Sequence, residues 1–252
     1  MKPFKALLTS LCLLMTFSSC SQSSAKPKEE SDRSQTTASS SQTGTSDGTQ
    51  RGKLLYMGHA SIRITTPEGK VIYIDPYAGN GYEPTADLIL VTHGHYDHTA
   101  TDKVVNRSPD CQTVTWKEAL VKGKHRTFDF GFAKVEAVEA GYNRMHSVKE
   151  CVGYIVTLSD GVSVYVSGDT SKTKQMKSLA ERHIDYAFYC CDGVYNMDID
   201  EAAECAKLVG AKHDIPYHVI AKNGVYFDRA KAENFDSPHL LIVEDGEEIA
   251  LQ

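Results

Sequence analysis

The sequence lacks two features that would each define a class of function. After residue 20 it contains no apolar run approaching the roughly 20 residues that a membrane-spanning helix needs. It also has no cluster of lysine and arginine, and its formal net charge is −6. A negative chain without a basic patch argues against nucleic acid as the main partner. The sequence leaves the oligomeric state open.

A regular cysteine framework is also missing. Apart from Cys12 and Cys20, the cysteines are irregularly spaced and odd in number: Cys111, Cys151, Cys190, Cys191 and Cys205. Such a set does not indicate a disulfide scaffold. Most of them lie in apolar runs, where a free thiol behaves as a small hydrophobic residue. Their redox state stays open, because the N-terminus indicates an oxidising compartment, in which disulfides persist.

The N-terminus has the pattern of a signal peptide. Residues 1–20 combine two lysines, an apolar stretch over residues 6–17 and small residues before Cys20. The cysteine after small residues resembles a bacterial lipoprotein cleavage site, with Phe17 where leucine is usual. We therefore predict a lipoprotein in the cell envelope, outside the cytoplasm and anchored in the membrane through lipidated Cys20. Plain secretion is the second interpretation.

Two further regions follow this signal segment. Residues 21–50 are rich in serine and threonine and contain no aliphatic run. Such a segment cannot bury enough apolar surface to offset its ordering entropy, so we predict a disordered tether. Residues 51–252 are long enough to form one domain with a substantial core.

The strongest chemical signal lies in residues 88–98. The apolar run over residues 88–91 predicts a buried strand, and His93, His95, Asp97 and His98 follow it directly. Burying such polar groups without partners costs roughly 2–7 kcal/mol each. Divalent metals accept both neutral imidazole and carboxylate as ligands. The dense spacing therefore predicts a site for two metal ions.

Short β-branched or aromatic runs between turn signals predict most of the remaining strands. Those near the N-terminal side form an antiparallel meander, and Asp160-Gly161 predicts a hairpin. A closing hairpin is expected around Asp245-Gly246, from residues 240–243 and 248–251. The other predicted strands are residues 53–56, 61–65, 71–74, 125–130, 133–138, 151–159, 162–167, 185–191 and 213–219.

Capping signals predict the helices. A capping box that begins at Thr115 predicts a helix ending at Gly123, and residues 173–181 predict an amphipathic helix. Asp198 is a good N-cap, and the same capping-box spacing there predicts a helix that Gly210 ends.

Residues 93–98 resemble the H-x-H-x-D-H signature of the metallo-β-lactamase superfamily. The resemblance extends over residues 53–251, within a branch that includes L-ascorbate-6-phosphate lactonase and related metal-dependent hydrolases. One departure is Asp192, where relatives tend to have glycine, and this extra carboxylate could change which substrates are accepted. The other matching motifs are Ala140-Gly-Tyr-Asn-Arg-Met-His146, Gly168-Asp169-Thr170, Gly193-Val-Tyr-Asn-Met-Asp198 and Ile215-Pro-Tyr-His218.

The resemblance implies an α+β fold, an αββα sandwich of two mixed or antiparallel sheets with helices on the outer faces. It also implies the ligand sets. The first metal would take His93, His95 and His146. The second would take Asp97, His98 and His218, with Asp169 bridging the two. Zinc is the first expectation, with manganese or iron as alternatives.

Four more residues have two interpretations each. Asp75 is either a turn former or an acceptor that orients a ligand histidine. His59 falls where relatives often carry a histidine near the site. Tyr142 and Tyr195 stand in motifs near the ligands, and are either donors to the substrate or leaving group or ordinary packing residues.

These residues predict a hydrolase that uses hydroxide bound to both metals, because a shared water loses its proton near neutral pH. Asp169 bridges, and Asp97 could hold or receive the proton of the water. The bond cleaved is an ester, lactone or phosphodiester in a small molecule outside the cytoplasmic membrane. The alternative is a non-catalytic surface lipoprotein that binds a metal or ligand on the same fold.

Overall fold

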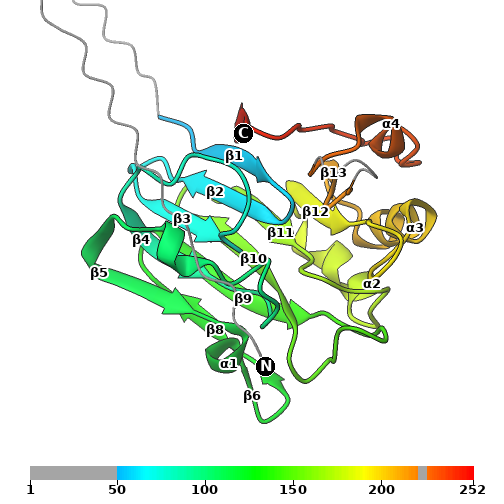
Figure 1. Cartoon of the computed structure of the whole chain (residues 1–252), viewed down its shortest axis with the longest axis horizontal. Helices are drawn as coiled ribbons and strands as arrows, with labels where there is room; N and C mark the ends of the chain where they lie inside the picture. Colours follow the sequence, from blue (N-terminus) through cyan, green and yellow to red (C-terminus); the bar gives the residue numbers. More distant parts are fainter. Residues whose placement is uncertain (1–49, 221–225) are drawn as a thin grey trace, which may run out of the picture. The chain divides into compact units, whose positions relative to one another are not determined.

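A computed structural model describes residues 50–220 and 226–252 of the chain (Figure 1). The predicted signal segment and almost all of the predicted tether lie outside these residues. Within them, none of the helices combines the length and the apolar character needed to cross a bilayer. The predicted domain over residues 51–252 is therefore the part whose architecture can be followed.

The first sheet has six strands in the order β14-β1-β2-β3-β4-β5. From β14 to β3 neighbouring strands are antiparallel, and β3, β4 and β5 are parallel. The predicted antiparallel meander is confirmed as β1, β2 and β3. The strands are β1 (Lys53–Gly58), β2 (Ser61–Thr65), β3 (Val71–Ile74), β4 (Ala86–Leu90), β5 (Arg107–Val114) and β14 (Glu247–Ala250).

The second sheet also has six strands, in the order β13-β12-β11-β10-β9-β8. Strands β8 to β11 are antiparallel, including the predicted hairpin of β10 and β11, whereas β11, β12 and β13 are parallel. The strands are β8 (Thr127–Asp129), β9 (Ala133–Glu139), β10 (Val152–Leu158), β11 (Ser163–Val166), β12 (Tyr186–Cys190) and β13 (His213–Tyr217). A separate small hairpin joins β6 (Leu120–Val121) and β7 (Lys124–His125).

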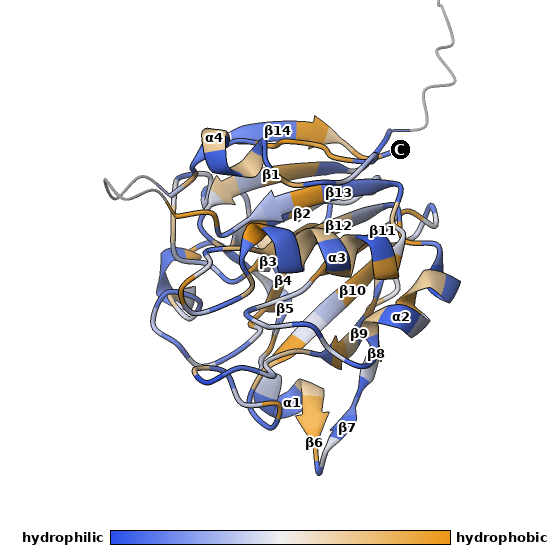
Figure 2. Ribbon diagram, turned by 90° about the vertical axis from the view of Figure 1, so that its right-hand side faces the viewer, coloured by the Kyte–Doolittle hydropathy of each residue, from blue (hydrophilic) through white to orange (hydrophobic). Residues whose placement is uncertain are grey.

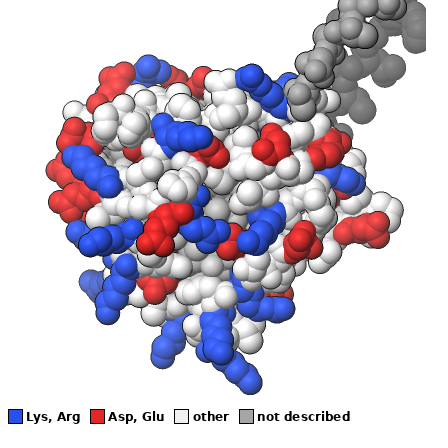
Figure 3. All heavy atoms as spheres, turned by 180° about the vertical axis from the view of Figure 1, so that it is seen from behind, with Lys and Arg blue, Asp and Glu red and all other residues white. Residues whose placement is uncertain are grey.

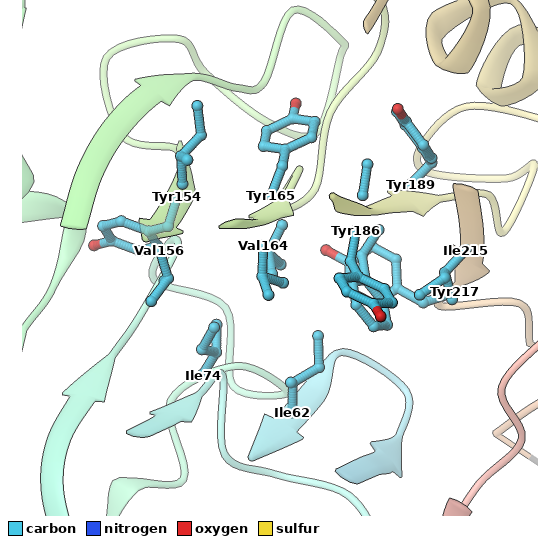
Figure 4. Packing of buried hydrophobic residues seen from close by; sticks show 14 of the residues in the cluster. Ile62, Ile74, Tyr154, Val156, Val164, Tyr165, Tyr186, Tyr189, Ile215 and Tyr217 are labelled. Carbon is cyan, nitrogen blue, oxygen red and sulfur yellow. The ribbon is translucent and has the colours of Figure 1, made fainter. Parts of the chain in front are cut away.

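The main core fills the space between the two sheets. Figure 4 shows Ile62 and Ile74 of the first sheet pointing toward Val164 of the second, while Tyr165 points to the opposite side of its strand. Alternate residues of β11 therefore face the inter-sheet core and the outer layer, as the two-residue period of a strand requires. This pattern confirms the predicted two-sheet sandwich.

The outer layer of the second sheet consists of helices. The longest described helix is α3 (Ile199–Val209), which packs its small buried residues against β12 and β13 and presents its hydrophilic side outward (Figure 2). Asp198 caps its first turn and Gly210, with φ of 66°, ends it, as predicted. The short helices are α1 (Trp116–Ala119), α2 (Met176–Leu179) and α4 (Arg229–Ala232), with 3₁₀ turns at Thr101–Lys103 and Ala180–Arg182.

The outer face of the first sheet has a thinner cover. Tyr73 and Ile89 on that face pack against Tyr82 and Val104, which belong to the long connections on either side of β4. Loops and the 3₁₀ turn at Thr101–Lys103 therefore cover the outer face of the first sheet, whereas helices cover that of the second. This leaves the long connection after β4 close to the sheet edge where the histidines lie.

Several predicted elements have different bounds. The helix expected from Thr115 to Gly123 ends at Ala119, and Gly123 instead forms the turn of the β6–β7 hairpin. The helix expected over residues 173–181 is reduced to α2 and a 3₁₀ turn. The expected closing hairpin was wrong, since β14 pairs with β1 and residues 240–243 form no strand.

The capping box predicted on α3 was half right. The Asp198 carboxylate accepts a hydrogen bond from the Glu201 N–H at 2.8 Å. The Glu201 side chain, however, accepts from the backbone N–H of Lys172 at 2.8 Å and does not return to the N-cap. Glu201 therefore connects α3 to the loop that follows Asp169.

The five cysteines of the described chain are free thiols, which confirms that they form no disulfide scaffold. All are buried except Cys111, which is half-buried. Lysine and arginine are mixed with acidic residues over most of the face drawn in Figure 3. At the lower end of that face, however, lysine and arginine predominate.

Candidate metal centre

Apart from His146, which lies between the antiparallel strands β9 and β10, the candidate ligands follow the carboxyl ends of parallel strands from both sheets. The loop with His93 follows β4, Asp169 follows β11 and His218 follows β13. The two sheets are joined at this edge, because the Val152 N–H donates to the Thr92 carbonyl at 3.0 Å. Side chains that are far apart in the sequence therefore meet at one edge of the sandwich.

The structure brings together all seven predicted ligands. Side-chain atoms of His93, His95 and His146 lie within 4.8 Å of one another, which is the first predicted set. A second group contains the other predicted set, Asp97, His98 and His218, together with His59, again within 4.8 Å.

Asp169 lies between these two groups. Its Oδ2 is 3.3 Å from His146 Nε2 on one side and 3.6 Å from His218 Nε2 on the other. Its Oδ1 is 3.5 Å from His98 Nε2. One carboxylate thus reaches both groups, which is the geometry that a bridging ligand needs.

The donor atoms at the centre fit divalent metal ions. His93 Nε2, His98 Nε2, His218 Nε2 and Asp169 Oδ1 are buried and have no hydrogen-bond partner in the protein. Buried polar atoms normally have partners, so four orphans converging on one region require an explanation. Imidazole nitrogen and carboxylate oxygen are the ligands that zinc, manganese and iron accept. The residues present therefore fit a metal pair.

Three ligand rings are held by a contact to Nδ1, which leaves Nε2 facing the centre. His98 Nδ1 lies 2.8 Å from Asp75 Oδ2, and His146 Nδ1 lies 3.0 Å from the Asn143 side-chain oxygen. The Thr92 hydroxyl donates to Asp75 and so can accept from His93 Nδ1 at 3.0 Å. Such contacts fix the tautomer of a metal-binding histidine. The interpretation of Asp75 as an acceptor behind a histidine is thus confirmed by its geometry.

Asp192 builds the loop beside the centre. Its Oδ1 accepts from the backbone N–H groups of Val194 and Tyr195, each at 2.7 Å. Its Oδ2 accepts from Asn196 Nδ2 at 2.7 Å, and the same Nδ2 donates to Asp169 Oδ2 at 2.8 Å. The Asp192 carboxylate is therefore buried beside the centre and used in hydrogen bonds, so any effect it has on substrate choice would act through the loop that it holds.

Backbone strain is concentrated at this edge. His59, Asp75 and His218 adopt left-handed conformations with φ of 53°, 45° and 56°, which cost about 1–2 kcal/mol for residues other than glycine. The His59 carbonyl accepts from the His218 N–H at 3.0 Å and from the Tyr56 hydroxyl at 2.8 Å. These contacts hold two of the strained residues against each other, as is common at functional sites.

Burial and mutual charge set the protonation states. Burial, reinforced by the neighbouring His98, lowers the pKa of His93 to about 2. Burial opposes ionisation of Asp169, but His218 and the other rings outweigh it and hold its pKa well below the usual range. Burial also opposes charge on His98, yet Asp169 and Asp75 raise the pKa of His98 to about 9. The centre thus has the neutral imidazole and carboxylate that metals need, with one proton on His98 for a metal to displace.

The centre opens into a cavity of about 630 Å³, which is within the usual range for small-molecule sites. Asp97 and Tyr195 line it, together with His95, His146, Asp169 and His218. Tyr142 does not belong to it. Tyr142, with φ of 63°, instead lines a separate depression with Glu139 and Lys122, so the structure does not place it in the cavity at the metal centre.

Sequence reasoning missed several residues of this region. Tyr77 and Tyr226 line the cavity but come from loops with no ligand spacing. Asn143 and Asn196 hold ligand side chains, and their only sequence signal was a position inside motifs that were interpreted through other residues. His59 was considered for its position alone, and the structure gives it a contact with Asp97.

Comparisons with known proteins agree with this geometry. Residues 53–218 match the family model described as a beta-lactamase superfamily domain. A UPF0173 metal-dependent hydrolase of Geobacillus thermodenitrificans is 32% identical over 193 residues, which cover 66% of this chain and 84% of that protein. A solved structure from Parabacteroides distasonis is 27% identical, with a TM-score of 0.61 over 75% of this chain and 93% of that one. A metallo hydrolase from Ignicoccus hospitalis, 19% identical, shares the fold with a TM-score of 0.62 over 80% of this chain and 98% of its own.

Proposed function

The chain belongs to the metallo-β-lactamase superfamily and is a metal-dependent hydrolase. From this premise we propose that two divalent metal ions act together to hydrolyse a small ester, lactone or phosphodiester. The observation that carries the proposal is the convergence of unpartnered, buried donor atoms from His93, His98, His218 and Asp169. A single metal would leave one of the two ligand groups without a role, although Asp169 reaches both.

Two bound divalent ions would supply hydroxide from a shared water near neutral pH and polarise the oxygen of the substrate. Neither serine nor cysteine lines the cavity in the described part of the chain, which favours direct attack by water over a covalent intermediate. Asp97 lies at the cavity wall with its Oδ2 held by His59 and is placed to hold or receive a proton from the water. The exposed Tyr195 hydroxyl can donate to the substrate or to the leaving oxygen.

The nature of the metal follows from the ligand types. Every candidate ligand atom is nitrogen or oxygen. Such a set accepts zinc, manganese or iron, and metal availability decides among them. Zinc is our first expectation because histidine-rich sites with carboxylates are common zinc sites.

We also propose that the hydrolase domain is tethered outside the cytoplasmic membrane. Support comes from the sequence of residues 1–20 and from the polar composition of residues 21–50. Mass analysis of the N-terminal peptide from membrane fractions tests this. We expect a lipid-modified Cys20 at the new N-terminus, and a Cys20→Ser chain that is released from the membrane. An unmodified, uncleaved N-terminus would exclude this attachment.

Elemental mass spectrometry of the purified full chain tests the metal pair. We expect close to two metals per chain, with a loss in His95→Ala and Asp169→Ala and none in the control His213→Ala. His213 is stacked on Tyr186, with ring centroids 4.8 Å apart, and belongs to neither ligand group. A measured content of one metal per chain would contradict the metal pair and indicate a mechanism with a single metal ion. No metal in a folded chain would contradict the proposal and favour a binding protein without hydrolase activity.

A further inference from the structure

The wall of the cavity above the candidate metal centre is mostly aromatic. Beside His59 and Asp97 lie Tyr77, Tyr96 and Tyr226. The Tyr77 ring contacts the other two edge-on, at centroid distances of 5.8 Å to Tyr96 and 6.2 Å to Tyr226. Such edge-to-face contacts fix the positions of aromatic rings. This side of the cavity is therefore a preformed apolar surface.

The opposite side, near His146 and Asp169, carries Met145 and Tyr195. The loops that bear them are connected, because the Asn143 side chain donates to the Asn196 side-chain oxygen at 3.4 Å, and Asn143 accepts from the Met145 N–H at 3.0 Å. Methionine adapts to irregular apolar shapes, and tyrosine adds area with one polar end. Apolar surface thus flanks the centre on both sides.

This cavity collects much of the exposed apolar surface of the molecule. Ten large hydrophobic side chains are exposed in the described residues, and five of them line this cavity: Tyr96, Met145, Tyr195, Ile220 and Tyr226. Contiguous exposed apolar surface at a site usually marks binding of an apolar partner or ligand. The size of the cavity restricts that ligand to a small molecule.

The charged groups of the cavity wall also favour a ligand without negative charge. Among residues 50–220 and 226–252, no lysine or arginine lines it, and its acidic groups are Asp97 and Asp169. Proteins commonly bind phosphate oxygens with arginine, lysine or backbone N–H groups. The neighbouring depression, by contrast, has Lys122 and Lys149 in its wall. The side chains of Lys122 and Lys149 therefore line a different depression from the one at the metal centre.

The Tyr77 hydroxyl is a phenol with an ordinary pKa of about 10, so it stays neutral across the physiological range. A neutral phenol can donate a hydrogen bond to a carbonyl or ether oxygen. It adds no positive charge that would balance an anionic substrate.

We propose that the substrate is a neutral carboxylic ester or lactone that carries an apolar group, a narrowing that rests on the hydrolase function proposed above. The oxygen of water bonds to the carbonyl carbon, and the bond from that carbon to the ester oxygen breaks with its electron pair. The leaving oxygen takes a proton from the water, giving an acid and an alcohol, or a hydroxy acid from a lactone. The apolar group lies against the tyrosines or against Met145.

Hydrolysis by the metal-loaded full chain tests the proposal. The substrates are p-nitrophenyl acetate, butyrate and hexanoate, the charged hemiglutarate of p-nitrophenol, and bis-p-nitrophenyl phosphate. We expect kcat/KM to rise about threefold to fourfold for each added methylene, the ratio that burial of a CH₂ group gives. The hemiglutarate should be at least tenfold slower than the hexanoate. A flat dependence on chain length, or faster cleavage of either anionic substrate, would overturn the proposal and leave the hydrolase function standing.

Variants of residues in the cavity wall test whether this wall causes the dependence of kcat/KM on acyl chain length. Tyr226→Ser and Met145→Ser should reduce the increase in kcat/KM per added methylene. Val105→Ser should not, because Val105 is also an exposed apolar residue but lies outside the cavity. Calorimetric binding of N-phenylacetamide and N-phenylhexanamide separates substrate class from catalysis. If the longer amide binds more tightly but no ester is hydrolysed, the apolar site is supported and the proposed hydrolase function is contradicted. Equal binding of both amides would contradict the apolar site.

Discussion

His59 Nε2 lies 2.9 Å from Asp97 Oδ2, so the turn between β1 and β2 holds a carboxylate of the histidine loop. The His59 side chain is buried, and its ring packs on His218 at a centroid distance of 3.9 Å. His59 therefore contacts two candidate ligands of the second metal group. It is itself within ligand distance of that group, either as a further ligand or as the residue that positions Asp97.

The first prediction concerns this contact. In His59→Gln the Asp97 carboxylate loses its ring partner, and affinity for the second metal should fall about 10- to 100-fold, the usual effect of removing such a supporting contact. Metal titration followed by calorimetry measures it. His213→Gln serves as the control and should bind metal as the wild type does. Unchanged affinity in His59→Gln would mean that Asp97 is positioned without it.

The second prediction concerns Asn196. Its Nδ2 group uses both hydrogens, one toward Asp169 and one toward Asp192. Asn196→Asp removes both donors and places a third carboxylate beside two others, so metal affinity should fall about 10- to 100-fold. The exposed Asn234→Asp, whose amide bonds only the Ala230 carbonyl, should leave affinity unchanged. Equal affinities in the two variants would show that Asp169 is oriented by the strand end alone.

The third prediction concerns Gly79. A Cβ atom there would lie 1.8 Å from the Met57 carbonyl oxygen, and φ is +66°. Gly79→Ala should lower the free energy of unfolding by about 2–4 kcal/mol, since it adds a backbone clash to the strain of the left-handed conformation. Gly123→Ala, with φ of +73° and no atom within 4 Å of its Cβ, should show only the strain, about 1–2 kcal/mol. Urea unfolding measures both, and equal losses would disprove the clash.

The fourth prediction uses Trp116, the one tryptophan of the sequence. Its ring packs against Gly94, where a Cβ would lie 2.8 Å from it, so it reports on the loop with His93 and His95. Removing metal with a chelator should change its fluorescence and lower Tm. A metal at 100 times its Kd contributes about 2.7 kcal/mol, or about 5–10 °C for a domain of this size. Trp116→Phe should lose the fluorescence signal and keep the change in Tm. An unchanged Tm would mean that metal does not stabilise the fold.

The fifth prediction concerns pH and Asp214, a buried residue of β13. Burial raises its pKa above the ordinary value, although the Ser237 hydroxyl donates to its carboxylate. A folded-state pKa above the unfolded one means that the unfolded chain loses this proton first. The free energy of unfolding therefore falls as the pH rises from about 4 through the pKa that Asp214 has in the folded state. Above that pKa the loss is complete and is not recovered.

Asp214→Asn removes that charge, so it should raise the free energy of unfolding more at pH 7 than at pH 4. The control is Asp236→Asn, at a side chain that is 83% exposed beside Lys207, and it should show little change between the two pH values. Denaturant titrations at both pH values give the comparison. A variant that is less stable than wild type at pH 7 would show that the hydrogen bonds outweigh burial.

The sequence predicted the ligand set because its chemistry is local. Four ligands lie within six residues, and the others follow strands in the order that the family resemblance implies. The supporting contacts could not be predicted in this way. His59 with Asp97, and Asn196 with Asp169, join segments whose proximity depends on how the sheets pack. Neither pair has a spacing that periodicity or capping could reveal.

The errors in the elements have a related cause. The capping box at Thr115 does form, but a cap starts a helix without setting its length, and the chain leaves the helix for β6. Asp245-Gly246 does form a turn, yet the strand after it pairs with β1 because a turn does not choose a distant partner. The edge strand β5 escaped prediction because its sequence contains Pro109 and several polar residues, which edge strands tolerate.

The ligands come from both sheets, and this has a consequence for a protein whose described cysteines are all free. A metal pair held by the loop after β4 and by the residues after β11 and β13 would cross-link the two halves of the sandwich, as a disulfide does in many secreted proteins. Loss of metal would then open the sandwich at this edge and expose it to proteases. If the domain lies outside the cytoplasmic membrane, as we propose, survival of the folded chain there would depend on the local supply of metal.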